Sequence, residues 1–139
     1  MIGKTIHEMK IGDTASMAKT VTEYDIYQFA GVTGDFNPIH INEEYASGTF
    51  FKGRIAHGML SAGFISAVVG TKLPGTGCVY LSQTVNFRAP VRIGDTITTT
   101  AEVVELFVEK NRVRLKTTCT NQDGTLVVDG EALMLAPKK

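Results

Sequence analysis

The sequence has no tryptophan, only two cysteines and three histidines, and no long run of apolar residues. No apolar stretch approaches the roughly 20 residues that a membrane helix needs, so we expect no membrane role. The opening residues MIGKTIHEMKIGD contain no apolar core of a signal peptide. Cys78 and Cys119 show neither CxxC spacing nor nearby histidine ligands, which is typical of reduced packing residues in a cytoplasmic protein.

An excess of either charge is also missing, since Lys plus Arg and Asp plus Glu both number 14. This balance argues against a nucleic-acid partner that is held by a strong basic field. The chain lacks a phosphate-binding P-loop and a GxGxxG dinucleotide motif, so no cofactor is expected. It also lacks a GxSxG nucleophile motif, and covalent acyl chemistry is therefore weakly supported. With 139 residues, 43% of them hydrophobic, residues 1–139 are predicted to form a single globular domain.

The first half of the sequence is predicted to be rich in helices and loops. Thr22 has the character of a helix N-cap, and Gly31 or Gly34 can end the helix that follows. A further helical turn is expected at Asn42–Tyr45. Residues of the first helix that are predicted to be buried are Tyr24, Ile26, Tyr27, Phe29 and Ala30.

The stretch from His57 to Leu73 has apolar residues around nearly its whole circumference, which predicts a helix enclosed by other structure. Its internal glycines suggest close approach of backbone. Strands are predicted at 14–21, 79–87, 96–108, 112–121 and 125–135, with a hairpin turn at Asp123–Gly124. This order predicts an α+β domain in which an antiparallel sheet wraps around the central helix. The open edges of one such sheet predict a homodimer.

The segment TGDFNPIH places Asp35 and His40 in one loop that Pro38 stiffens. Such a loop can be purely structural, because Asp35 could form an Asx-turn and His40 could satisfy a buried carbonyl. The functional interpretation is a pair of groups that handle protons.

A second motif, AHGM, stands where the apolar helix begins. It can be a simple helix start, with His57 near the cap. Alternatively, the backbone N–H of Gly58, which no side chain covers, can stabilise a developing oxyanion. Asp35, His40 and His57 are also the residue types of a two-histidine, one-carboxylate metal site, although we predict no metal.

Together, FAGVTGDFNPIH and IAHGML resemble the signature of the MaoC-like (R)-specific enoyl-CoA hydratases, which have the hot-dog fold. The resemblance covers essentially the whole chain, including YLSQTVNFRAPVRIGD and the closing strands. It implies reversible hydration of trans-2-enoyl-CoA to (R)-3-hydroxyacyl-CoA, on short acyl chains such as crotonyl-CoA. It also implies homodimers with an acyl tunnel near the subunit boundary.

The resemblance implies roles for individual positions. Asp35 and His40 match the catalytic pair that activates a water, and Gly58 matches the glycine whose N–H receives the thioester oxygen. The predicted substrate-binding residues are Asn37, His57 and Ser66. The acyl-CoA substrate needs a basic rim, for which the candidates are Lys52, Arg54, Arg88 and Arg92, and an acyl carrier protein could use the same surface. Val69 and Met134 are candidates for the tunnel wall.

Two other functions on the same fold remain open at this stage. An acyl thioesterase commonly places a carboxylate on or beside the central helix, and His57–Thr71 contains no Asp or Glu. A non-catalytic acyl-thioester binding protein would have no need for both Asp35 and His40. The helical glutamate of the fatty-acid-synthesis dehydratases is missing as well.

Overall fold

The chain first forms strand β1 (Thr14–Thr20) and helix α1 (Glu23–Thr33) in the computed structural model, which describes residues 1–139. Thr22 is the N-cap of α1, as predicted, and forms a reciprocal capping box with Asp25. Gly34 ends the helix in the left-handed conformation at φ 81°, a region that glycine adopts without steric cost. The local sequence therefore determines both ends of α1.

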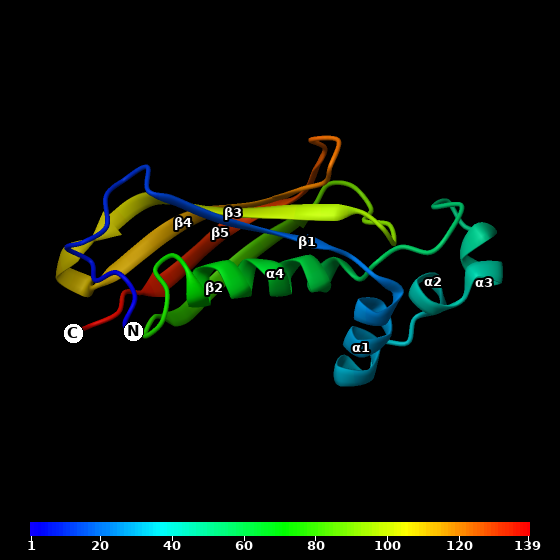
Figure 1. Cartoon of the computed structure of the whole chain (residues 1–139), viewed down its shortest axis with the longest axis horizontal. Helices are drawn as coiled ribbons and strands as arrows, with labels where there is room; N and C mark the ends of the chain where they lie inside the picture. Colours follow the sequence, from blue (N-terminus) through cyan, green and yellow to red (C-terminus); the bar gives the residue numbers. More distant parts are fainter.

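Three further helices follow α1. Two are short, α2 (Pro38–Ile41) and α3 (Glu43–Ser47), and the third is the apolar helix α4 (Gly58–Thr71). In Figure 1, α1, α2 and α3 gather at one end of the molecule, and the two chain termini lie at the other end. The chain between α1 and α4 is thus set apart from most of the sheet.

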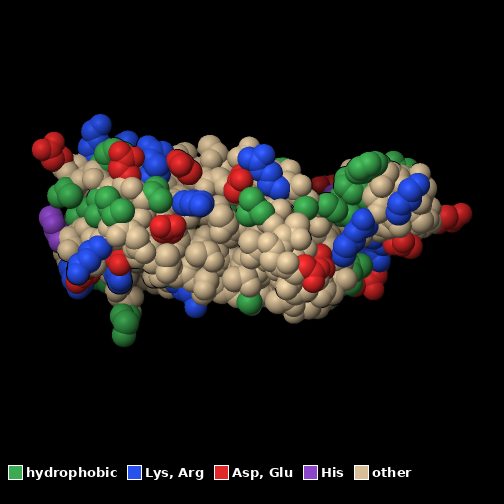
Figure 2. Space-filling view, turned by 90° about the horizontal axis from the view of Figure 1, so that it is seen from above, with side chains coloured by type: hydrophobic (Ala, Val, Ile, Leu, Met, Phe, Trp, Pro, Cys, Tyr) green, Lys and Arg blue, Asp and Glu red, His purple; other side chains and the backbone are tan.

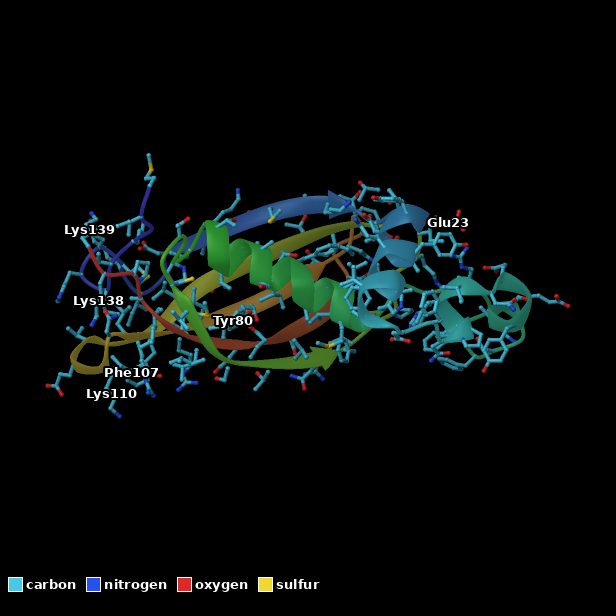
Figure 3. The ribbon with its side chains drawn as sticks, turned by 90° about the horizontal axis from the view of Figure 1, so that it is seen from below. Glu23, Tyr80, Phe107, Lys110, Lys138 and Lys139 are labelled. Atoms are coloured by element: carbon cyan, nitrogen blue, oxygen red, sulfur yellow. The ribbon has the colours of Figure 1, made fainter.

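The strands form one antiparallel sheet in the order β1-β3-β4-β5-β2. The strands after α4 are β2 (Val79–Phe87), β3 (Thr96–Phe107), β4 (Arg112–Thr120) and β5 (Leu126–Leu135), with a 3-10 turn, η1 (Val108–Lys110), between β3 and β4. Strands β1 and β2 are the two edges. Figures 1 and 3 show α4 lying along the concave face of this sheet, which is the hot-dog arrangement that the sequence predicts.

The core lies between α4 and the concave face of the sheet. Alternate residues of β3 and β4 point inward, as in Val103 and Leu115, and pack with Ile65 of α4. All three side chains are completely buried. Burial of each such side chain stabilises the fold by about 1.5–3 kcal/mol before the entropy of ordering is counted.

The outer face of the sheet is polar, and Figure 2 shows acidic and basic side chains interspersed over the surface seen from above. Arg114, for example, bonds Glu105 at 3.0 Å. None of the helices has the length and apolar character needed to cross a bilayer.

Two predictions about burial are wrong. Tyr24 and Tyr27 are 69% and 47% exposed, because only Ile26 and Ala30 of α1 reach the core. Helix α4 is not enclosed on all sides either. One of its faces is open, with Met59 55% exposed and empty space around Gly63.

Candidate functional site

The segment that carries Asp35 and His40 is built from a turn and a short helix. The Asp35 carboxylate accepts a hydrogen bond from the N–H of Asn37 at 3.2 Å, and the Asn37 side chain caps α2 by accepting from Ile39 N–H at 3.2 Å. Pro38 occupies the first turn of α2, where its missing N–H costs nothing. His40 therefore projects from a helical turn and not from an extended loop, a feature that the sequence analysis missed. Asn37 orients this segment.

One backbone contact and burial define the chemical state of His40. Its Nδ1 lies 2.8 Å from the carbonyl oxygen of Ile55, and the residue is only 9% exposed. Because a carbonyl can only accept, Nδ1 carries the proton and Nε2 keeps a free lone pair. The pKa of His40 is lowered from 6.5, mainly by burial and to a smaller extent by His57. The hydrogen bond to Ile55 and the nearby Asp35 carboxylate oppose this shift. His40 is therefore neutral at pH 7.

His57 lies beneath this segment as the N-cap residue of α4 and is 2% exposed. Its Nε2 is 2.9 Å from the carbonyl oxygen of Asp35 and 4.0 Å from the carboxylate of the same residue. Its ring stacks on that of His40, with the centroids 3.9 Å apart. It also contacts the ring of Phe29, whose plane is tilted by 50° relative to that of His57. His57 lines neither the pocket beside Gly58 nor the hollow beside Ser66, and its contact with substrate stays a prediction.

Gly58 begins α4 beside a pocket of about 470 Å³. No acceptor within the protein engages its N–H. A Cβ at this position would lie 2.6 Å from the ring of Phe87, so glycine allows the end of β2 to approach the start of α4. The pocket thus combines a free backbone donor with the ring of His40.

The rest of this pocket is largely apolar. Its lining residues besides His40 and Gly58 are Phe50, Phe51, Ile55, Ala56, Met59, Ser61, Phe87, Arg88, Ala89, Pro90, Val91 and Val128. Asp35 is outside this lining, and its side chain is 49% exposed. A side-chain atom of Asp35 and a ring nitrogen of His40 nevertheless lie within 4.8 Å of each other.

Ser66 lies away from His40, on the open face of α4. It lines a second hollow of about 380 Å³ between α4 and β2, together with Met59 and Tyr80. Figure 3 shows Tyr80 between these two elements. Met59 lines both hollows, so they are neighbours. Val69 and Met134 line neither hollow, because both are completely buried in the core, contrary to the prediction of a tunnel wall.

The metal alternative does not fit the geometry of its donors, although Asp35, His40 and His57 come within 4.8 Å of one another. A metal ion binds an imidazole in the plane of the ring. The two rings are stacked at 3.9 Å with only 30° between their planes, so their lone pairs run alongside each other and do not meet at one point. His57 Nε2 and His40 Nδ1 are also directed at carbonyl oxygens.

Two of the four candidate basic residues have structural roles instead. Arg54 has a side chain only 10% exposed, donates through Nε to the carbonyl of His40 at 2.7 Å, and bonds Glu23 at 2.6 Å. Arg92 donates to the carbonyls of Phe51, Gly53 and Arg54. Arg88 lines the pocket and is exposed, with its Nε donating to Asp129 at 3.1 Å. Lys52 is exposed and follows the lining residue Phe51. No sequence pattern indicates the roles of Arg54 and Arg92, because both act on backbone atoms that folding brings together.

The family model described as "MaoC like domain" matches residues 7–126 of the chain. The chain is 56% identical over 132 residues to an (R)-specific enoyl-CoA hydratase of Rhodospirillum rubrum, covering 95% of this chain and 91% of the relative. It is 52% identical to a 3-hydroxybutyryl-CoA dehydratase of Methylorubrum extorquens, with 95% and 83% covered.

Solved structures are similar over the same range. An R-hydratase from Pseudomonas aeruginosa in the unliganded form has 46% identity and a TM-score of 0.93, covering 99% of this chain and 88% of that one. An (R)-hydratase from Aeromonas caviae, described as involved in PHA biosynthesis, has 37% identity and a TM-score of 0.90, with 93% and 98% covered.

Proposed function

The chain belongs to the MaoC-like domain family, and on this basis we propose that it catalyses the reversible, (R)-specific hydration of trans-2-enoyl-CoA to (R)-3-hydroxyacyl-CoA. The observation that carries the proposal is His40 itself, whose Nε2 is free and which has a ring nitrogen within 4.8 Å of the Asp35 carboxylate. It lines the same pocket as Gly58, whose N–H is unengaged. A short substrate such as crotonyl-CoA agrees with the 3-hydroxybutyryl-CoA dehydratase among the relatives.

In this proposal Gly58 acts on the thioester. Its N–H donates to the carbonyl oxygen, where negative charge develops when the double bond is attacked. The partial positive charge at the start of α4 favours the same oxygen. Both effects make the β carbon of the enoyl group more electrophilic.

Asp35 and His40 act on the water. A gap of up to 4.8 Å between a carboxylate and an imidazole can hold one water that is hydrogen-bonded to both. His40 Nε2 takes one proton from this water while its oxygen bonds the β carbon. The imidazolium then returns the proton to the α carbon, so that atoms and charge balance. Delivery of oxygen and hydrogen from the same side gives syn addition.

The apolar wall of the 470 Å³ pocket suits a short acyl chain, and the exposed Lys52 and Arg88 suit the phosphates of CoA. An acyl carrier protein is also acidic and could contact the same two residues. Hydration rates measured with crotonyl-CoA and with a crotonyl group on acyl carrier protein distinguish these two substrates.

We also propose that the active form is a homodimer. Strand β2 is an open edge whose Val79 and Phe87 are each 54% exposed, and the adjacent face of α4 exposes Met59. Pairing of two β2 edges would satisfy their free backbone groups and cover the hollow between α4 and β2.

The test is incubation with crotonyl-CoA while the enoyl-thioester absorbance and free thiol are followed in parallel. We expect loss of the absorbance without thiol release. Thiol release with intact absorbance would identify a thioesterase, and tight binding without either change would identify a binding protein.

A further inference from the structure

We propose that His57 is a positioning residue that fixes the separation and the orientation of Asp35 and His40. The inference rests on the proposed hydratase activity and adds a role that the motif alone does not assign. The side chain of His57 contacts both partners: its N–H donates to the backbone carbonyl of Asp35, and its ring stacks on the ring of His40.

The hydrogen bond determines the tautomer of His57. The Asp35 carbonyl 2.9 Å from Nε2 can only accept, so Nε2 carries the proton. Nδ1 is then a bare acceptor, and it is buried without a partner. The contact with Asp35 therefore makes Nε2 the donor nitrogen of His57.

The stack restrains His40 from the side. The ring of His57 contacts His40 at 3.9 Å and Phe29 at 4.7 Å, and His57 is the N-cap residue of α4. The ring of His40 is also held at its edge by the Ile55 carbonyl. With one face covered and one edge bonded, the Nε2 lone pair has a fixed direction. A misplacement of about 1 Å at a reacting group can cost about 10²-fold in rate.

Three substitutions separate the two contacts. His57→Gln can keep a donor near the Nε2 position but removes the ring, His57→Phe keeps a stacking ring but removes the donor, and His57→Ala removes both. We expect kcat for crotonyl-CoA hydration to fall about 10²-fold in His57→Ala and less in the other two, with KM changed less than about threefold. His7→Gln and His7→Phe are the matched controls at an exposed histidine and should behave as wild type.

A double-variant cycle distinguishes positioning from a merely structural role. If His57 acts through His40, His57→Gln should cost little more in a His40→Gln background, whereas independent effects would add. Unchanged kcat in all three variants, a rise in KM alone, or full additivity would overturn the proposal. Wild-type protein that does not hydrate crotonyl-CoA at all would instead refute the proposed function.

A measurement on the wild-type protein covers the case in which the variants do not fold. Imidazole ¹⁵N NMR, assigned with His7→Gln and His40→Gln, should find His57 protonated at Nε2 and His40 protonated at Nδ1. The opposite tautomer at His57 would contradict the proposed contact with Asp35, whatever the activity.

Discussion

At the scale of single residues, the site depends on backbone carbonyl groups as much as on side chains. The carbonyl of Ile55 sets the tautomer of His40, and the carbonyl of Asp35 sets that of His57. Each leaves one ring nitrogen without a proton. For His40 that nitrogen is the proposed base, and burial keeps it unprotonated by lowering the pKa of the ring.

Loss of either member of the proposed pair should affect the chemical step. We expect Asp35→Asn and His40→Gln each to lower kcat by about 10²–10⁴, the usual contribution of general acid–base catalysis. Binding of a non-hydratable acyl-CoA, measured by calorimetry, should change little. Either variant with the wild-type rate would contradict the assigned roles.

The state of His40 also predicts the acid limb of the pH profile. Because the pKa of His40 in the folded protein is below 6.5, kcat/KM should fall with a midpoint below pH 6.5. The same shift affects stability: above pH 6.5 both folded and unfolded chains hold a neutral His40, and below it the unfolded chain takes up the proton first. Acidification should thus destabilise the wild type more than His40→Gln. A midpoint at or above 6.5 in the rate profile would show that burial does not control this group.

At the scale of elements, the active region depends on the place where α4 begins beside the end of β2. Gly58 allows this approach, since a Cβ there would lie 2.6 Å from the ring of Phe87. The ring is 54% exposed and can swing aside, which would bring it into the pocket that it lines.

Gly58→Ala should therefore be impaired by crowding although its N–H is retained. Overpacking typically costs about 1–3 kcal/mol, and we expect a comparable loss in kcat/KM, about tenfold. In a Phe87→Ala background, where the ring is absent, Gly58→Ala should cause little further loss of kcat/KM. An equally large loss in that background would place the defect elsewhere, in the N–H itself or in α4.

Arg92 connects the segment before α4 to the segment before β3. Its guanidinium donates to three carbonyls within residues 51–54, next to the Ile55 carbonyl that holds His40. Arg92→Lys should lower stability by about 1–3 kcal/mol, because a point-like ammonium cannot reproduce the planar fork. It should also lower kcat. Chemical denaturation and turnover assays measure the two effects, and a neutral outcome in both would remove this connection from the account.

Sequence patterns predicted the elements that local chemistry determines. The Thr22 cap, the Gly34 stop and the alternating strands are local features, and they appear within one or two residues of the expected positions. The inward Arg54 was not predictable in this way, because it depends on contacts with Glu23 and with the backbone of His40, which are distant in the sequence. The open face of α4 escaped prediction for a similar reason, since an apolar helix can face a sheet on one side and a partner on the other.

At the scale of the whole molecule, the exposed β2 edge and the open face of α4 predict a dimer. Sedimentation equilibrium should give twice the chain mass of 15.0 kDa. Gly63→Lys should weaken the dimer, because Gly63 is exposed on the open face with no atoms near its Cβ position. Thr98→Lys, on the exposed outer face of β3, is the control and should leave it intact. A monomeric wild type, or equal effects of the two variants, would contradict the proposed interface.

The central claim is that Asp35 and His40 deliver both parts of one water to the same face of the substrate. Hydration of crotonyl-CoA in D₂O tests it directly, with NMR analysis of the configuration at the α and β carbons of the product. We expect an (R)-3-hydroxyl with deuterium added syn to it. An (S) product, or deuterium on the opposite face, would contradict it.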